Sequence, residues 1–238
     1  MAEKIYPGGP RLNCFAGMYC EIALESYYNA MISYGRIKDA EYSWDAWSEY
    51  YAMEKSIIST IIFSAMCIEA FFNDYAATCL GDSDFYDNFD KLAVLDKFEL
   101  IARFILKSKV ERSKSYYSRL KSLIKNRNLY IHNKSKNVDI KECTLEELQA
   151  FEEASPICEF ECEQPKLNSA EIKNDMRIAL DALKTIHEVA VYFDERDENI
   201  FATTRIFGNS GFFQSESEKQ YKSAVLPLLG IKVISYEV

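Results

Sequence analysis

Hydrophobic positions recur every three or four residues over long stretches of this chain, with few breaks between the stretches. That spacing places apolar side chains on one face of an α-helix, and sparse glycines and prolines allow the helices to be long. The pattern predicts an all-α, up-and-down helical bundle. We expect its helices at about 12–34, 43–80, 92–105, 111–132 and 168–193.

The ends of several predicted helices carry capping residues. Gly35 stands where the first helix would need a left-handed residue to end. Ser43 and Asp45 are both good N-cap types for the second helix. Asn168 and Glu171 form a capping box at the start of the last one.

The segments between these helices lack a helical period. Residues 81–87 predict a polar loop, and 133–166 predict an irregular stretch. Within that stretch we expect a short acidic helix at 145–154 and a strand at 157–162. The sequence closes on β-branched residues at 231–234, which favour a strand.

The chain divides by character near Asp197, after which it becomes aromatic and contains glycine. We expect a helical bundle over 1–197, with its core at 43–135 and its closing helix at 168–194. Residues 198–238 would then form an irregular extension that includes a strand and packs on the bundle or on a partner.

The most apolar stretch, 57–72, is shorter than the roughly 20 residues of a membrane span and contains Glu69. We therefore predict a buried helix of a soluble bundle there. The N-terminus shows no basic stretch followed by an apolar one, so we expect no signal peptide. Seven scattered cysteines indicate no disulfide framework and favour a reducing, cytoplasmic location.

Charge is distributed unevenly along the chain. The total of 28 Lys and Arg against 37 Asp and Glu gives −9, which by itself argues against a nucleic-acid partner. Residues 103–136, however, hold eleven basic residues and one acid, Glu111, so this strip is about +10 and the rest about −19. Such a strip can attract a polyanion. A solvated helix face that pairs with the acidic segment 142–163 explains it equally well.

Only two histidines are available for acid–base chemistry. His187 lies on the apolar stripe of the last predicted helix, which is typical of a core or boundary residue. His132 differs, because it ends the basic helix and follows Arg127 with four residues between them.

Three segments resemble the HEPN superfamily. Arg127-Asn128-x-x-x-His132 is similar to its R-x(4–6)-H motif, including the frequent Asn after the Arg. The segment 68–74 resembles the family's helix with an acidic residue, here Glu69, in an apolar context, and 91–98 is similar to the region between those helices. The resemblance implies a helical bundle that dimerises, placing Arg and His of both protomers in one cleft. It also implies, in many members, a metal-independent endoribonuclease.

The side chains suit that chemistry. RNA carries its own nucleophile, the ribose 2′-hydroxyl, which His132 would deprotonate while Arg127 binds the phosphate through bidentate hydrogen bonds. Asn128 would orient either His132 or the phosphate, and Glu69 would orient Arg127. The products would be a 2′,3′-cyclic phosphate and a 5′-hydroxyl, formed without metal or cofactor. We expect the strip to bind single-stranded or looped RNA through Lys121, Lys125, Lys134, Lys136 and Arg119.

Helix geometry favours a shared site. At 100° per residue, Arg127 and His132 lie about 140° apart on one helix, so two protomers facing each other would supply converging copies better than one helix can. The resemblance implies such a homodimer, and it also implies an antitoxin or defence-system protein as a further partner.

Two other interpretations stay open. The chain could be a non-catalytic HEPN-like module that binds a partner protein or nucleotide, or a helical protein without a site.

One toxin branch of the family has a Tyr where this chain has Lys134, so nucleotidylation at that place is not supported. Cys158 and Cys162 lack a second ligand pair for zinc. The aromatic residues at 42–51 fit a core or dimer face better than a base-stacking surface.

Overall fold

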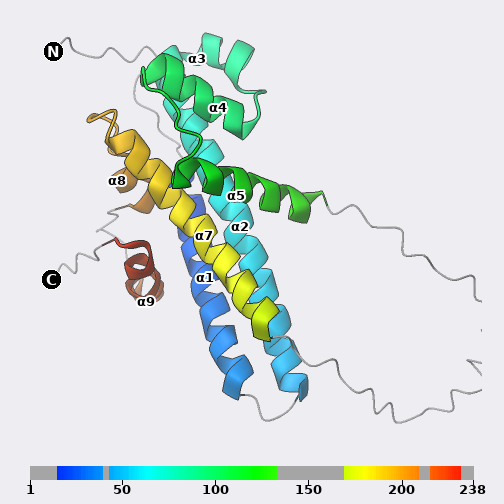
Figure 1. The fold of residues 1–238 in the computed structure, drawn as a ribbon. Helices are drawn as coiled ribbons and strands as arrows, with labels where there is room; N and C mark the ends of the chain where they lie inside the picture. Colours follow the sequence, from blue (N-terminus) through cyan, green and yellow to red (C-terminus); the bar gives the residue numbers. More distant parts are fainter. Residues whose placement is uncertain (1–14, 40–42, 133–168, 209–214, 232–238) are drawn as a thin grey trace, which may run out of the picture.

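The protein is described by a computed structural model that covers residues 15–39, 43–132, 169–208 and 215–231. This part of the chain is mostly helical, and none of it forms a strand (Figure 1). The all-α prediction is therefore confirmed for the described residues. The helix expected at 145–154 and the strand expected at 157–162 lie outside them, as does all but Ile231 of the strand expected at 231–234.

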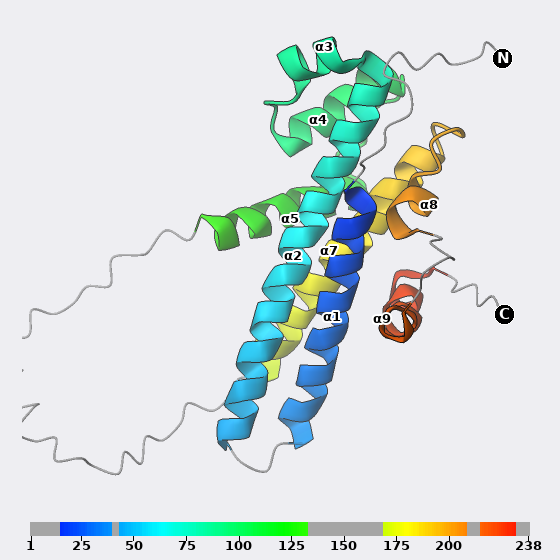
Figure 2. The same ribbon diagram turned by 180° about the vertical axis from the view of Figure 1, so that it is seen from behind.

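The body of the fold consists of α1 (Ala16–Asp39), α2 (Ser43–Leu80) and α7 (Ser169–Asp194), which lie side by side along their length (Figures 1 and 2). α1 runs antiparallel to α2. The predicted end of the first helix at Gly35 is wrong, because α1 continues to Asp39. Gly35 is exposed and has open space around it, so the helix passes through it without a cap.

α2 is the only described helix that is long and apolar enough to cross a membrane, judged by length and composition alone. Half of its most apolar window is buried inside the structure. Met53, Ile57, Ile61 and Ile68 lie at helical spacing and are all at most 1% exposed. Their burial against α1 and α7 accounts for the apolar character of α2 by packing alone.

The chain between α2 and α5 caps the C-terminal end of α2. Residues 81–87, predicted as a polar loop, instead begin two helical turns, α3 (Asp82–Asp84) and η1 (Phe85–Phe89). Buried Phe85 and Phe89 anchor these turns, which explains why a polar sequence folds against the bundle. The helix predicted at 92–105 is present as α4 (Val94–Leu100), followed by the π-helical turn η2 (Ile101–Ile105).

An aromatic cluster joins α2, α4 and α7. The Phe193 ring lies 4.9 Å from Phe71 and 5.7 Å from Phe72. Phe98 of α4 stacks on Phe72 at 5.6 Å and reaches Tyr192 of α7 at 5.1 Å. Aromatic pairs at these separations attract each other beyond the area they bury. The cluster therefore fixes α4 on α2.

α5 (Ser115–Ile131) crosses α2 and α7, and its C-terminal half projects from the bundle (Figure 2). Leu120 and Leu123 are buried at the crossing, whereas Leu129 and Ile131 near the free end are 61% and 46% exposed. The helix predicted at 111–132 is thus present, and its projecting end is called the α5 arm. Of the described basic residues of the strip, four lie on α5 (Arg119, Lys121, Lys125 and Arg127) and five precede it (Arg103, Lys107, Lys109, Arg112 and Lys114).

The region after Asp197 is less irregular than its composition predicts. α8 (Ala202–Phe207), α9 (Glu216–Val225) and the 3-10 turn η3 (Leu226–Leu229) pack on α1 and α7. The Ser215 hydroxyl accepts from the Glu218 N–H at 3.1 Å, and this S-x-x-E capping pattern marks the start of α9 in the sequence. Tyr221, Val225 and Leu226 are buried in the same core as the bundle.

Replacing Phe98 by alanine should expose the dependence of α4 on the aromatic cluster. Phe98 is fully buried, so we expect Phe98→Ala to lower the free energy of unfolding by about 3–5 kcal/mol in urea denaturation. Phe104→Ala is the matched control, because Phe104 is 61% exposed and its loss should matter by less than about 0.5 kcal/mol. Equal losses in the two variants would contradict this account of the packing.

Candidate functional site

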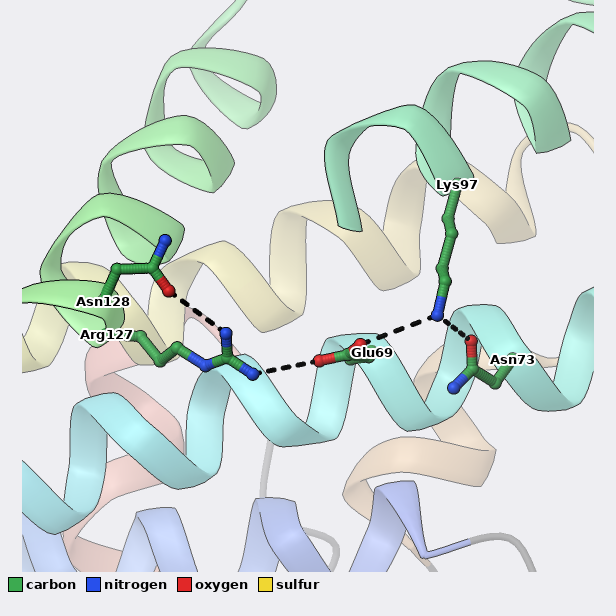
Figure 3. A network of polar contacts seen from close by, with 5 residues as sticks. All are labelled: Glu69, Asn73, Lys97, Arg127 and Asn128. Carbon is green, nitrogen blue, oxygen red and sulfur yellow. Dashed lines mark hydrogen bonds and ion pairs between the residues drawn. The ribbon is translucent and has the colours of Figure 1, made fainter. Parts of the chain in front are cut away.

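Glu69 lies on the side of α2 that faces both α4 and α5. Its neighbour Ile68 is buried in the core, while the Glu69 side chain is 29% exposed. One carboxylate oxygen, Oε2, accepts a hydrogen bond from Arg127 Nη2 at 3.3 Å (Figure 3). The other, Oε1, lies 3.6 Å from Lys97 Nζ. A single carboxylate thus bridges two cations from two different helices.

Arg127 lies on the inner stripe of α5, in line with buried Leu120 and Leu123. Its side chain is 25% exposed. Besides the Glu69 contact, Nη1 donates to Asn128 Oδ1 at 3.1 Å. The buried Nε–H has no acceptor among the residues that the structure describes. The guanidinium is therefore held at both terminal nitrogens yet keeps donors that are unused.

Lys97 belongs to this network although the sequence assigns it no role. Its side chain is 1% exposed, and Nζ donates to Asn73 Oδ1 at 2.8 Å (Figure 3). Asn73 and Glu69 are one helical turn apart on α2, so both face Lys97. The residue lies within the segment 91–98 that resembles the HEPN superfamily, but only the packing of α4 on α2 shows which groups it meets.

His132 lies at the C-terminal end of α5, away from the contact between Arg127 and Glu69. It ends α5, where its backbone N–H donates to the Asn128 carbonyl at 3.0 Å, and its side chain is exposed. No hydrogen bond or ion pair joins its imidazole to any described residue. One copy of the chain therefore holds Arg127 inward against Glu69 and His132 outward, as the angle of about 140° between them requires.

The basic residues expected to bind RNA separate into different environments. Lys121 and Lys125 are exposed and lie with His132 within an arc of about 40° on the outer face of α5. Arg119 faces α7 instead, where it pairs with Glu188 at 2.9 Å and approaches Asp181 at 3.9 Å. Lys134 and Lys136 lie outside the described residues. Of the expected RNA-binding residues that the structure describes, only Lys121 and Lys125 lie on the outer face of α5.

Large apolar side chains surround the free end of α5. Leu129 is 61% exposed and Ile131 is 46% exposed. Tyr130 leans back toward the bundle: partial burial raises the pKa of its phenol, and the nearby carboxylates Asp175 and Glu54 raise it further. The end of α5 thus has Tyr130 toward α2 and α7, while Leu129 and Ile131, about 160° apart on the helix, expose apolar surface on two other sides.

The remaining sequence candidates lie elsewhere. The His187 ring contacts Phe207 at 5.9 Å between centroids, and burial lowers the pKa of its imidazole. Trp47 and Tyr51 form part of an aromatic group on the outer side of α2, where Tyr51 is 56% exposed. Within the described residues no group of His, Cys, Asp or Glu could hold a metal ion. Cys158 and Cys162 lie outside that part of the chain.

The network makes a prediction about stability. Glu69→Gln removes the anion beside fully buried Lys97, so we expect the free energy of unfolding to fall by about 1–3 kcal/mol, measured by urea denaturation. Glu99→Gln is a matched control, because the Glu99 side chain is equally exposed at 28% but its cation, Arg112, is 68% exposed. The Glu99 variant should lose clearly less. A loss of the same size in both would show that burial of the partner does not matter.

Comparisons of this chain with protein-family models, with curated proteins and with solved structures give no match. The likeness to the HEPN superfamily therefore rests on the residues themselves: the motif from Arg127 to His132, the helix around Glu69 and the segment 91–98.

Proposed function

We propose that this protein is a metal-independent endoribonuclease of HEPN type, built on a HEPN-like bundle and acting in a toxin or anti-phage defence role. The observation that supports it best is the contact between Arg127 and Glu69 at 3.3 Å. It holds a partly exposed guanidinium in place, and each terminal nitrogen keeps a second N–H besides the one that pairs with Asn128 or Glu69. An arginine arranged in this way suits bidentate binding of a phosphodiester.

The reaction needs few groups from the protein. His132 takes the proton of a ribose 2′-hydroxyl, and the resulting oxygen attacks the adjacent phosphorus. Arg127 donates hydrogen bonds to the non-bridging oxygens, whose negative charge grows in the transition state. The bond to the 5′-oxygen breaks, and that oxygen takes a proton from water, while His132 later returns its proton to solvent. The products are a 2′,3′-cyclic phosphate and a 5′-hydroxyl.

The site requires two copies of the chain in this proposal. Arg127 and His132 of one copy lie on different faces of α5, so the two groups that act on one phosphate come from different protomers. The exposed Leu129 and Ile131 near the end of α5 supply apolar surface for the contact. Lys121 and Lys125 then follow the RNA backbone away from the reacting phosphate.

A non-catalytic HEPN-like module that binds a partner protein or nucleotide is the second candidate. The observation that favours it is the same separation: within one copy, the His132 imidazole contacts none of the other site residues. In that case Arg127 would be a structural ion-pair partner of Glu69, and His132 a surface residue. RNA cleavage distinguishes the two functions directly.

The first test is cleavage of RNA by the purified protein in EDTA. We expect His132→Ala and Arg127→Ala each to lower the rate by at least about a hundredfold, because they remove the proton acceptor and the phosphate ligand. His187→Gln is the matched control, since that imidazole packs against Phe207 away from α5, and it should cleave as fast as the wild type. A substrate with a 2′-deoxyribose at the cut site should resist.

The outcome that rejects an enzyme is equal cleavage, or none, in the wild type and both alanine variants. The catalytic proposal also fails if cleavage stops only when EDTA is added, since no step described above uses a metal. Binding of a partner without any cleavage would favour the second candidate.

A mixing experiment tests the shared site. We expect His132→Ala and Arg127→Ala chains, each inactive alone, to regain activity when unfolded and refolded together, because a mixed dimer contains one intact His132 and one intact Arg127. Sedimentation of the same mixture would establish the dimer. Failure of the mixture to cleave, although it sediments as a dimer, would place both groups in one protomer.

A further inference from the structure

Lys97 has the most deeply buried charged side chain among the described residues, at 1% exposed. It projects from α4 into the contact with α2, next to the fully buried ring of Phe98. Moving an ammonium out of water costs free energy unless partners compensate. A methionine of similar shape would fill the space without that cost. Packing alone therefore does not explain a lysine at this position.

The partners of Lys97 lead toward the proposed site. Nζ donates to Asn73 Oδ1 at 2.8 Å and lies 3.6 Å from Glu69 Oε1. Glu69 is the only partner of Lys97 that also contacts Arg127 in the described part of the chain. The Lys97 ammonium pairs with Glu69 Oε1. The other carboxylate oxygen, Oε2, then faces Arg127 Nη2 (Figure 3).

Charge balance gives Lys97 a second effect on Arg127. If Glu69 paired with Arg127 alone, its negative charge would cancel the positive charge with which Arg127 attracts a phosphate. With Lys97 present, Glu69 is shared between two cations, and the three side chains together carry one net positive charge. Because Lys97 is buried, salt screens its effect on Arg127 less than it screens surface lysines.

We infer that Lys97 is a positioning residue: acting through Glu69, it orients Arg127 and preserves its charge for the RNA phosphate. The inference rests on the proposed function of the same site. Lys97 itself does not touch RNA, since its side chain is inaccessible from outside. Remote groups that hold a phosphate-binding side chain in its working orientation affect the reaction through that side chain.

Lys97→Met is the main test, because it keeps the shape and removes the charge. We expect kcat for RNA cleavage to fall by about tenfold or more, since a misplaced ligand for the transition state costs rate. KM should change by less than about twofold, because Lys121 and Lys125 still bind the RNA backbone. Lys97→Arg, which keeps the charge, should recover part of kcat.

Lys222→Met is the matched control. Lys222 is also a buried lysine, 4% exposed, and it pairs with Glu21 at 3.3 Å where α9 packs on α1. Its loss should lower the melting temperature without changing kcat at temperatures well below unfolding. If both variants lose kcat equally, Lys97 acts only through stability and the inference is wrong.

The pathway through Glu69 is tested in a double-mutant cycle. In a Glu69→Gln background, Lys97→Met should lower kcat no further. The carboxylate through which Lys97 acts has already been replaced by a neutral amide. If Lys97→Met lowers kcat by the same factor in both backgrounds, its effect does not pass through Glu69.

A spectroscopic measurement separates this inference from the proposed function. In protein labelled with ¹⁵N-arginine, the Arg127 Nε–H resonance is assigned by its absence in Arg127→Lys. We expect Lys97→Met to shift or broaden that resonance and Lys222→Met to leave it unchanged. If the wild type cleaves RNA but Lys97→Met leaves the Arg127 resonance unchanged, the role of Lys97 is wrong and the proposed function stands. A shift in a protein without ribonuclease activity overturns the proposed function and retains the coupling of Lys97 to Arg127.

Discussion

The arrangement of this molecule depends on the aromatic contact that joins α2, α4 and α7. Phe98 stacks on Phe72, and Phe193 lies against both Phe71 and Phe72. α4 has only two turns of helix and could not hold a position by its own hydrogen bonds. Anchored by Phe98, it presents the neighbouring residue Lys97 to the polar groups of α2. The charged network is thus placed by an apolar one.

Burial divides the cations around the α5 arm into three kinds. Lys97 is enclosed, Arg127 is partly exposed, and Lys121 and Lys125 are open to solvent. Screening by salt and water decreases from the last group to the first, so equal charges have unequal strength at a phosphate. In the proposed function, an acidic body with such a graded basic site would attract RNA broadly along α5 and hold it firmly only near Arg127.

Sequence periodicity was enough to locate the long helices, because buried faces such as Met53, Ile57 and Ile61 repeat with the helical turn. It failed where local sequence and tertiary packing disagree. Gly35 looks like a helix end but lies within α1, and the polar residues 81–87 fold because Phe85 and Phe89 are buried. α9 was not predicted, since an irregular extension was expected there, although the Ser215–Glu218 capping pattern marks the start of that helix.

The contacts around Glu69 could also be predicted only in part from the sequence. Pairing Glu69 with Arg127 follows from the need of a carboxylate in an apolar helix for a cation, and the two side chains are in contact. Lys97 could not be placed from spacing, because its distance to Glu69 depends on how two helices pack. That packing has one more consequence. Lys97 reaches Asn73 and Glu69, one turn apart on α2, so sliding α4 along α2 by a turn would strand the ammonium without one of them. The contacts of Lys97 with both residues therefore add an electrostatic penalty against that slip to the register that Phe98 fixes by packing.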